Sequence, residues 1–308
     1  MVKKFLIMRM LGNDMPNIHN EHQTITNLEF TLKNETAFKN TDKVYLLNRI
    51  YDKKKRDTII ALLKRYKTQY VEIPFNMSYF KKLPKLDYSY NELVKMNRHE
   101  YIPSLIKHNL YLVNNNKARN YCIIYGKKHD YTWTFVLDSN SYFITKDYYG
   151  IINNIHHKSD YIEIPQYRLD DVNLKNGVLL TKKRLPKQPD FEPQIAFKKT
   201  SKHKFNEKIP YGLSEKAELL NALGSKGIWN NYLDNERYVN IKTRLFKNVN
   251  LQKSSKIIRL SSHNNINTIN HNWDNRWYGL YKSVKKINSF QVDSSQVDSS
   301  QVDSSQVD

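Results

Sequence analysis

The sequence predicts an α/β protein with a mostly parallel sheet flanked by helices. Short apolar runs rich in β-branched and aromatic residues alternate with segments whose apolar residues recur at helical spacing, which is typical of parallel sheets with helical crossovers. Polar side chains follow several of the apolar runs, as they do at the ligand-binding edge of such a sheet. With 308 residues the chain is long enough for one large domain, which we expect to span residues 1–288.

The N-terminal quarter predicts the order strand, helix, strand, helix, strand. In the first helical segment Ile25, Leu28 and Leu32 fall on one face. The spacing of these elements suits right-handed crossovers in a parallel sheet. The expected strands are 2–10 (VKKFLIMRM), 42–50 (DKVYLLNRI) and 69–75 (QYVEIPF), and the expected helices are 23–35 and 53–67.

The central part predicts further strands and helices after an interruption. Residues 76–110 are basic and rich in Tyr and Lys, and we expect an irregular insertion or lid there. A helix over 114–125 should end at Gly126, and the pattern 212–224 predicts a helix ended by Gly224. The expected strands here are 132–137 (TWTFVL), 160–165 and 193–199, while 225–288 is basic, aromatic and less regular.

The C-terminus is a short tandem repeat. Four QVD units recur every five residues over 289–308, a period that matches neither helix nor strand. The units are too polar to bury a core, so we expect a disordered tail. The tail carries four Asp and no basic residue, which raises the net charge of the remaining chain from +20 to +24.

Composition limits the classes of function without selecting one. The excess of basic residues suits polyanionic partners such as nucleic acid, an anionic membrane surface or phosphorylated small molecules. No apolar run is long enough to span a membrane, and Arg9 interrupts the short apolar stretch at the N-terminus, which therefore reads as a strand rather than a signal peptide. The single cysteine, Cys122, excludes an internal disulfide framework and fits a reducing compartment. We expect a cytoplasmic protein.

Three polar groups follow expected strands and should meet at the carboxyl edge of the sheet. They are Gly12-Asn13-Asp14, Asn48-Arg49 and Asp138-Ser139-Asn140. Carboxylate and amide oxygens at this edge suit a hard divalent cation that bridges a diphosphate. Basic side chains suit the phosphates themselves, and the candidates are Arg9, Arg49 and Arg119. The same D-x-N pattern is also typical of an ordinary Asx-turn.

The ordered set of short motifs in this chain resembles a family of mostly uncharacterised microbial proteins. The motifs are LGND, QTITNLEF, LNRI, IPF, NNNKARN, the D-x-N turn, EPQ and KAELL, and they extend over roughly residues 5–225. The layout of that family is similar to GT-A glycosyltransferases, in which an A-R-N helix precedes a strand that ends in D-x-D. The resemblance implies a GT-A-like, Rossmann-type fold and transfer of a sugar from a nucleotide-diphosphate donor to a hydroxyl of a glycan or glycoconjugate.

The resemblance also implies roles for particular residues. Asp138 and Asn140 match the first and last positions of the D-x-D motif, where Mn²⁺ or Mg²⁺ binds, and His263 matches a late histidine metal ligand. Asn140 departs from the motif because it is not a carboxylate, which puts the metal in doubt. Arg119 and Asn120 match the A-R-N element, and the segment from Arg9 to Asp14 would contact the nucleotide. Glu192 is the expected base on the acceptor hydroxyl, with Glu215 or Glu218 as alternatives.

Two other functions compete with this interpretation. A nucleic-acid-binding protein would use the positive charge and three tryptophans, Trp229, Trp273 and Trp277, to stack bases. No helix-turn-helix, RNA-recognition or zinc signature accompanies them, so no specific nucleic-acid partner is expected. A nucleotidyltransferase would share the sheet edge but would need a Gly-rich phosphate loop, where this chain has only Gly12. Under the glycosyltransferase interpretation, residues 225–288 would shape the acceptor site or contact an anionic membrane surface.

Overall fold

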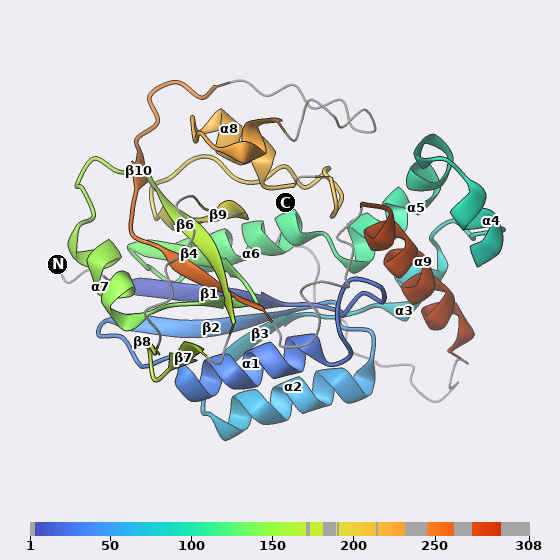
Figure 1. Cartoon of the computed structure of the whole chain (residues 1–308), viewed down its shortest axis with the longest axis horizontal. Helices are drawn as coiled ribbons and strands as arrows, with labels where there is room; N and C mark the ends of the chain where they lie inside the picture. Colours follow the sequence, from blue (N-terminus) through green and yellow to red (C-terminus); the bar gives the residue numbers. More distant parts are fainter. Residues whose placement is uncertain are drawn as a thin grey trace.

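The fold is organised around one large mixed sheet (Figure 1). A computed structural model of the chain describes residues 4–170, 173–180, 189, 191–213, 215–231, 245–261 and 273–290. Within these residues the sheet has the strand order β3-β2-β1-β4-β9-β6-β11-β5, and β10 also pairs with β6. The strands are β1 (Phe5–Leu11), β2 (Thr41–Asn48), β3 (Gln69–Ile73), β4 (Trp133–Asp138), β5 (Ser141–Tyr142), β6 (Tyr161–Asp170), β9 (Phe191–Lys198), β10 (Leu251–Lys253) and β11 (Ile257–Ser261). Two short strands, β7 (Leu174–Lys175) and β8 (Val178–Leu179), form a separate hairpin.

Strand directions bring several carboxyl ends to one edge of the sheet. Strands β3, β2, β1 and β4 are parallel. Strand β9 runs antiparallel between β4 and β6, and β11 is parallel to β6. The carboxyl ends of β1, β2, β4, β6 and β11 therefore lie at the same edge as the amino end of β9. We refer to this edge as the carboxyl edge.

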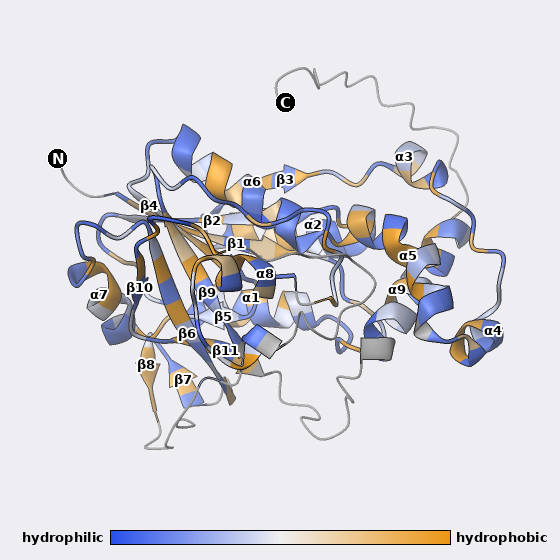
Figure 2. Cartoon of the chain, turned by 90° about the horizontal axis from the view of Figure 1, so that it is seen from above, coloured by the Kyte–Doolittle hydropathy of each residue, from blue (hydrophilic) through white to orange (hydrophobic). Residues whose placement is uncertain are grey.

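Helices cover both faces of the sheet (Figure 1). Leu6 and Met8 of β1 pack in one buried cluster with residues of α6 (Asn115–Lys128) and α8 (Ala217–Ala222). Phe5 and Ile7 point to the opposite face, toward α7 (Thr145–Asn153), because successive side chains of a strand alternate. On that second face α1 (Gln23–Asn34) and α2 (Lys53–Arg65) pack against the ends of β1 and β2. Figure 2 shows apolar residues concentrated in the strands and hydrophilic residues on the outer helices.

A helical module lies beyond the carboxyl edge, at the right of Figure 1. It consists of α3 (Met77–Lys81), α4 (Tyr90–Lys95), α5 (Arg98–Leu112) and α9 (Trp273–Ser289), which share one buried apolar cluster. The expectation of an irregular segment over 76–110 is therefore wrong. Two capping boxes, Ser89 with Glu92 and Asn97 with Glu100, start α4 and α5 and satisfy backbone N–H groups there.

Gly126 also differs from its predicted role. It lies inside α6 rather than at its end, and α6 continues to Lys128. A Cβ at position 126 would meet Thr134 Oγ1 at 1.8 Å. The glycine thus permits close packing of α6 on β4. Gly224 does follow α8, with a φ of +81° that favours glycine.

The predicted fold class, a mostly parallel α/β sheet flanked by helices, is confirmed. At the C-terminus α9 includes Ser289, and the Phe290 ring lies 6.3 Å from that of Tyr51, so the first two residues of the predicted tail belong to the folded body. The rest of that tail, 291–308, lies outside the described residues. No helix in the described part of the chain combines the length and apolarity that crossing a membrane requires.

Candidate active site at the carboxyl edge

Asp138 is the centre of a charged cluster at the carboxyl edge. It is the last residue of β4, and Val136, two residues earlier, packs against α6, so Asp138 points to the same face. Its Oδ1 accepts from Arg119 Nη2 at 3.1 Å, and its Oδ2 accepts from Gln194 Nε2 at 3.0 Å and Lys216 Nζ at 3.1 Å. The Asp138 side chain is 25% exposed, whereas those of Arg119 and Lys216 are only 3% and 7% exposed.

The surroundings of Asp138 keep it ionised. Burial alone would raise the pKa of its carboxyl group, but Lys216, Arg119 and the Gln194 amide outweigh that effect and hold the pKa well below its usual range. Arg259 of β11 acts in the same direction. Asp138 is therefore a fixed negative charge that orients two buried cations.

Two further carboxylates belong to the cluster. Glu215 Oε1 lies 3.7 Å from Arg119 Nη1 and accepts from Asn115 Nδ2 at 3.2 Å. Glu192, near the start of β9, interacts electrostatically with Lys216, Glu215 and Arg119. Burial raises the pKa of Glu192, and Glu215 adds to that rise while Lys216 opposes it. A carboxylate whose pKa is raised is a stronger base than an exposed one, which suits it to accept a proton.

Asparagine side chains hold the loop that carries Lys216 and Glu215. Asn109 of α5 exchanges two hydrogen bonds with the backbone of Tyr211. Asn116 of α6 donates to the backbone oxygens of Asn206 and Glu215. Asn120 exchanges two bonds with the Phe205 backbone and donates to Glu207 Oε1 at 2.8 Å. These asparagine side chains of α5 and α6 therefore provide hydrogen bonds that fix the loop over residues 203–216.

Two arginines extend the cluster toward the helical module. Arg259 and Arg276 both interact electrostatically with Tyr211 and with His19. The guanidinium carbon of Arg276 lies 5.3 Å from the centre of the Tyr211 ring. His19 accepts from Met15 N at 2.8 Å, and burial, reinforced by Lys55 and the two arginines, lowers its pKa to about 4. We call Arg119, Lys216, Arg259 and Arg276 the edge bases.

The predicted residues after β1 and β2 mainly connect neighbouring elements. Asn13 donates to the backbone oxygen of Arg49 and accepts from Tyr51 N. Arg49 is buried and stacks over the Tyr111 ring. Asp14 binds Lys55 at 2.9 Å and accepts from Thr24 N and Oγ1 at the start of α1. The backbone oxygen of Gly12 accepts from Lys55 Nζ at 2.9 Å. His19 lies close enough to both Asp14 of this loop and Arg259 of the edge bases for each to affect its pKa. The loop is therefore electrostatically coupled to the edge bases.

Arg9 lies near the carboxyl end of β1 but on the face of the sheet opposite to Asp138, so the structure does not bring it into the cluster. Its side chain is 1% exposed and forms a 2.5 Å ion pair with Glu35, while Nε donates to the Ser141 backbone. The neighbours Ile7 and Leu11 pack on the face of α7 and α1, opposite to the face of Asp138. The alternation of side chains along β1 explains the difference.

The donor set around Asp138 does not fit a divalent cation. Such a cation needs several oxygen ligands, but both oxygens of Asp138 face N–H donors, and two of these are positively charged. Among the residues that the structure describes, no three or more His, Cys, Asp or Glu side chains are grouped to hold a metal ion. The Asn140 backbone oxygen accepts from Leu260 N, and His263 lies outside the described residues.

Several residues of the cluster were not predicted from the sequence. Lys216 and Gln194 lie within the KAELL and EPQ motifs, so their motifs were recognised but their side chains were not singled out. Arg259 and Arg276 come from the less regular 225–288 region. Two of the tryptophans proposed to stack bases are buried, Trp229 at 3% and Trp277 at 1% exposure, which corrects that role. Nothing is described of the Trp273 side chain.

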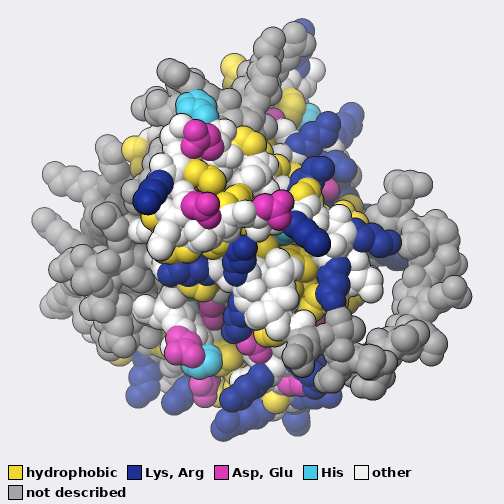
Figure 3. All heavy atoms as spheres, turned by 90° about the vertical axis from the view of Figure 1, so that its right-hand side faces the viewer, with side chains coloured by type: hydrophobic (Ala, Val, Ile, Leu, Met, Phe, Trp, Pro, Cys, Tyr) yellow, Lys and Arg dark blue, Asp and Glu magenta, His cyan; other side chains and the backbone are white. Residues whose placement is uncertain are grey.

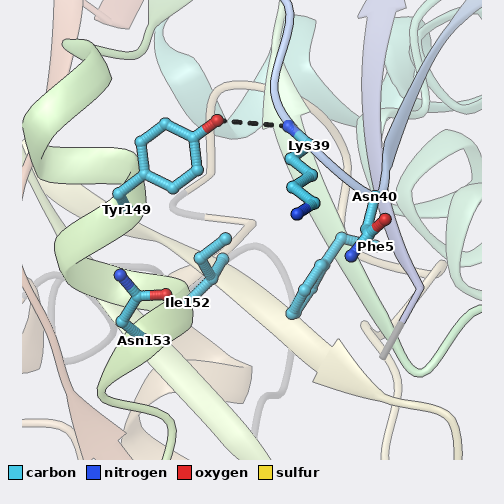
Figure 4. A pocket seen from close by; sticks show the side chains of 6 residues that line it. All are labelled: Phe5, Lys39, Asn40, Tyr149, Ile152 and Asn153. Carbon is cyan, nitrogen blue, oxygen red and sulfur yellow. Dashed lines mark hydrogen bonds between the residues drawn. The ribbon is translucent and has the colours of Figure 1, made fainter. Parts of the chain in front are cut away.

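The surface has a hollow at a distance from the Asp138 cluster. A hollow of about 450 Å³ lies between the amino ends of β1 and β2 and helix α7, at the edge opposite to Asp138 (Figure 4). There the Lys39 backbone N–H donates to Tyr149 Oη at 3.2 Å.

On the side of the helical module, Lys and Arg side chains are interspersed with Asp and Glu rather than gathered into one band (Figure 3).

Comparisons with known proteins give partial structural likeness. No protein-family model matches the chain, and no curated protein is similar to it in sequence. Residues 1–349 of TarS from S. aureus superpose with a TM-score of 0.36 at 14% identity over 67% of this chain and 51% of that chain. The mannosyltransferase PcManGT from Pyrobaculum calidifontis, in complex with GDP-Man and Mn²⁺, gives 0.37 at 7% identity over 84% and 56%. Mouse xyloside xylosyltransferase 1 gives 0.28 at 9% identity over 65% and 68%. The chain thus spans about half the length of the first two.

Proposed function

We propose that this protein is a glycosyltransferase that moves a sugar from a nucleotide-diphosphate donor to a hydroxyl group of a glycan or glycoconjugate. The observation that carries the proposal is the cluster around Asp138. It combines buried positive charge with a carboxylic acid of raised pKa at the sheet edge where open α/β sheets bind ligands. The motif resemblance over residues 5–225 supports the same reaction.

The proposed reaction is a direct displacement at the anomeric carbon of the donor sugar. The acceptor oxygen forms a bond to that carbon, and the bond from the carbon to the diphosphate oxygen breaks. The hydroxyl proton passes to the Glu192 carboxylate, whose raised pKa makes it a better base than an exposed glutamate. Lys216 and Arg119 stabilise the negative charge that develops on the leaving diphosphate.

Asp138 is proposed to act by holding these cations and by contacting the donor through its exposed part. Its bonds to Lys216 and Arg119 fix both side chains before the donor arrives. The loop 12–14 would contact the nucleotide, because Asp14 is linked through His19 to the edge bases. The helical module and the described parts of 225–288 would shape the acceptor side.

The test is release of the nucleotide product from a panel of UDP-, GDP-, CMP- and dTDP-sugars by the full chain. We expect release from one donor, and we expect Asp138→Asn to lower turnover by about 100-fold or more, because the change removes the charge that orients both cations. Asp130→Asn is the matched control, since Asp130 is an exposed partner of Lys199 on the surface. Unchanged turnover in Asp138→Asn would refute the role of Asp138.

A silent panel would favour the nucleic-acid alternative. The net charge of +20 is the observation in its favour. That alternative predicts binding to single-stranded nucleic acid that weakens steeply with salt. Titration of a labelled oligonucleotide at two salt concentrations separates the two functions.

A further inference from the structure

We propose that the edge bases take over the charge-neutralising role of a divalent cation, so that this protein binds the donor diphosphate without a metal. The inference rests on the proposed function and specifies how its leaving group is held. It concerns the ligand at the carboxyl edge: a diphosphate held by lysine and arginine side chains.

The position of Lys216 and Arg119 is the first argument. Each lies 3.1 Å from a different oxygen of Asp138, so both carboxylate oxygens already have a positively charged partner. A metal ion at Asp138 would therefore lie beside two positively charged side chains that repel it, or would displace one of them. Displacement of a buried charge from its partner is costly.

The number of charges is the second argument. Among the residues that the structure describes, four edge bases act on the cluster, against three carboxylates: Asp138, Glu192 and Glu215. A diphosphate carries the negative charge that would balance this excess.

The remaining hydrogen-bonding capacity is the third argument. A lysine ammonium has three N–H donors and a guanidinium has five. Asp138 takes one bond from Lys216, and Arg119 donates one bond each to Asp138 and Asn116. Phosphate oxygens can therefore be bound while Asp138 keeps its partners. Arginine also presents paired donors that match phosphate geometry.

The origin of the edge bases is the fourth argument. Arg119 comes from α6, Lys216 from the start of α8, Arg259 from β11 and Arg276 from α9. Four elements that are distant in sequence thus direct basic side chains to one edge. Such convergence concentrates positive charge in a partly buried place, where its effect on an anion is larger than at the surface.

The test is calorimetric titration of the full chain with UDP, GDP and inorganic pyrophosphate, each in EDTA and in Mn²⁺. We expect one nucleoside diphosphate to bind in EDTA with a Kd within about threefold of its value in Mn²⁺. Lys216→Met should weaken this binding about 10-fold or more, whereas Lys216→Arg should retain most of it. Lys226→Met, an exposed lysine beyond α8, is the matched control and should bind as the unaltered chain does.

Each other outcome has a separate meaning. Binding that appears only with Mn²⁺ would overturn the metal-free inference and leave the glycosyltransferase proposal standing. Metal-free binding that Lys216→Met does not change would overturn the role of the edge bases. Absence of nucleoside diphosphate and pyrophosphate binding under both conditions would overturn this inference and the proposed function together. Circular dichroism of each variant shows whether a loss of binding reflects loss of the fold.

Discussion

Asp138 and Glu192 share two cationic neighbours, Arg119 and Lys216, yet their pKa values move in opposite directions. Asp138 forms direct bonds with both cations, which outweigh the effect of burial. For Glu192 burial is the largest effect, and Glu215 adds repulsion. Two carboxylates whose surroundings separate their pKa values are suited to different tasks, here a fixed charge and a proton acceptor.

Glu192→Gln tests this division at a single residue. Because burial raises the pKa of Glu192 in the folded state, ionisation of this side chain costs folding free energy once the pH exceeds the unfolded value of about 4.3. The amide avoids that cost. We therefore expect Glu192→Gln to stabilise the protein by about 1 kcal/mol at neutral pH and to abolish most turnover. The gain should vanish below about pH 4, as urea unfolding across the pH range would measure.

Glu218→Gln is the control for that experiment. Burial also raises the pKa of Glu218, so a stabilisation in the same direction is expected there. Among the residues that the structure describes, no edge base contributes to that rise in pKa. Its turnover should stay near that of the unaltered chain. A loss of turnover in Glu218→Gln, with activity kept in Glu192→Gln, would transfer the base role to Glu218.

At the scale of elements, helix α6 determines where the site lies. Its N-terminal asparagines bind the backbone of the loop over 203–216, and Arg119 on the same helix binds Asp138. Close packing of α6 on β4 through Gly126 brings the helix and the strand end together. The resemblance implied that Asn120 contacts the donor, whereas its hydrogen bonds are to Phe205 and Glu207.

Asn120→Ala tests this structural role. The change leaves the Phe205 N–H and C=O without their buried partners, and we expect a destabilisation of about 2–3 kcal/mol. Hydrogen exchange should increase over residues 203–216, because Asn120 holds this loop. Lys117→Ala, an exposed residue of the same helix, should change neither quantity. Exchange that stays slow over 203–216 would show that Asn120 does not hold the loop.

The elements that could be predicted from sequence are those with a regular pattern. Strands β1 to β4 and helices α1, α2 and α6 follow from apolar periodicity, within a few residues at their ends. The antiparallel insertion of β9 between β4 and β6 depends on pairing between segments far apart in sequence, which periodicity does not encode. The helices α4 and α5 were not predicted because tyrosines and lysines interrupt the apolar periodicity of their sequences. Their capping boxes, however, could be recognised in the sequence.

The same reasoning explains which site residues could be predicted. Asp138 follows an apolar strand, a local signal that can be read directly. Arg259 and Arg276 lie in segments with no distinguishing pattern, and the motif that contains Lys216 does not single out its side chain. Only the folded chain brings Lys216 and Arg259 near Asp138 and Arg276 near Glu192. A basic residue in a chain of net charge +20 carries little information by itself.

At the scale of the whole molecule, helix α9 connects the other helices of the helical module to the loop after β1. Helix α9 packs against α5 and α4 and carries Arg276 toward Tyr211. The Ser283 hydroxyl of α9 donates to Met15 Sδ at 3.6 Å, and Met15 belongs to the loop after β1. Helix α9 and Phe290 therefore belong to the folded body, and the helix is part of both the core and the candidate site.

Two truncations test this boundary. A chain that ends at Phe290 keeps every described contact of α9, so we expect its thermal midpoint to stay within about 1 °C of that of the full chain. A chain that ends at residue 272 loses the five apolar side chains of α9 that the structure describes as buried, and their combined burial is comparable to the usual total stability of a domain. We expect that shorter chain to fail to fold cooperatively in calorimetry. The side chains lost are Trp277, Leu280, Tyr281, Val284 and Ile287. A drop of more than about 4 °C on removal of 291–308 alone would instead place the repeat segment in the folded body.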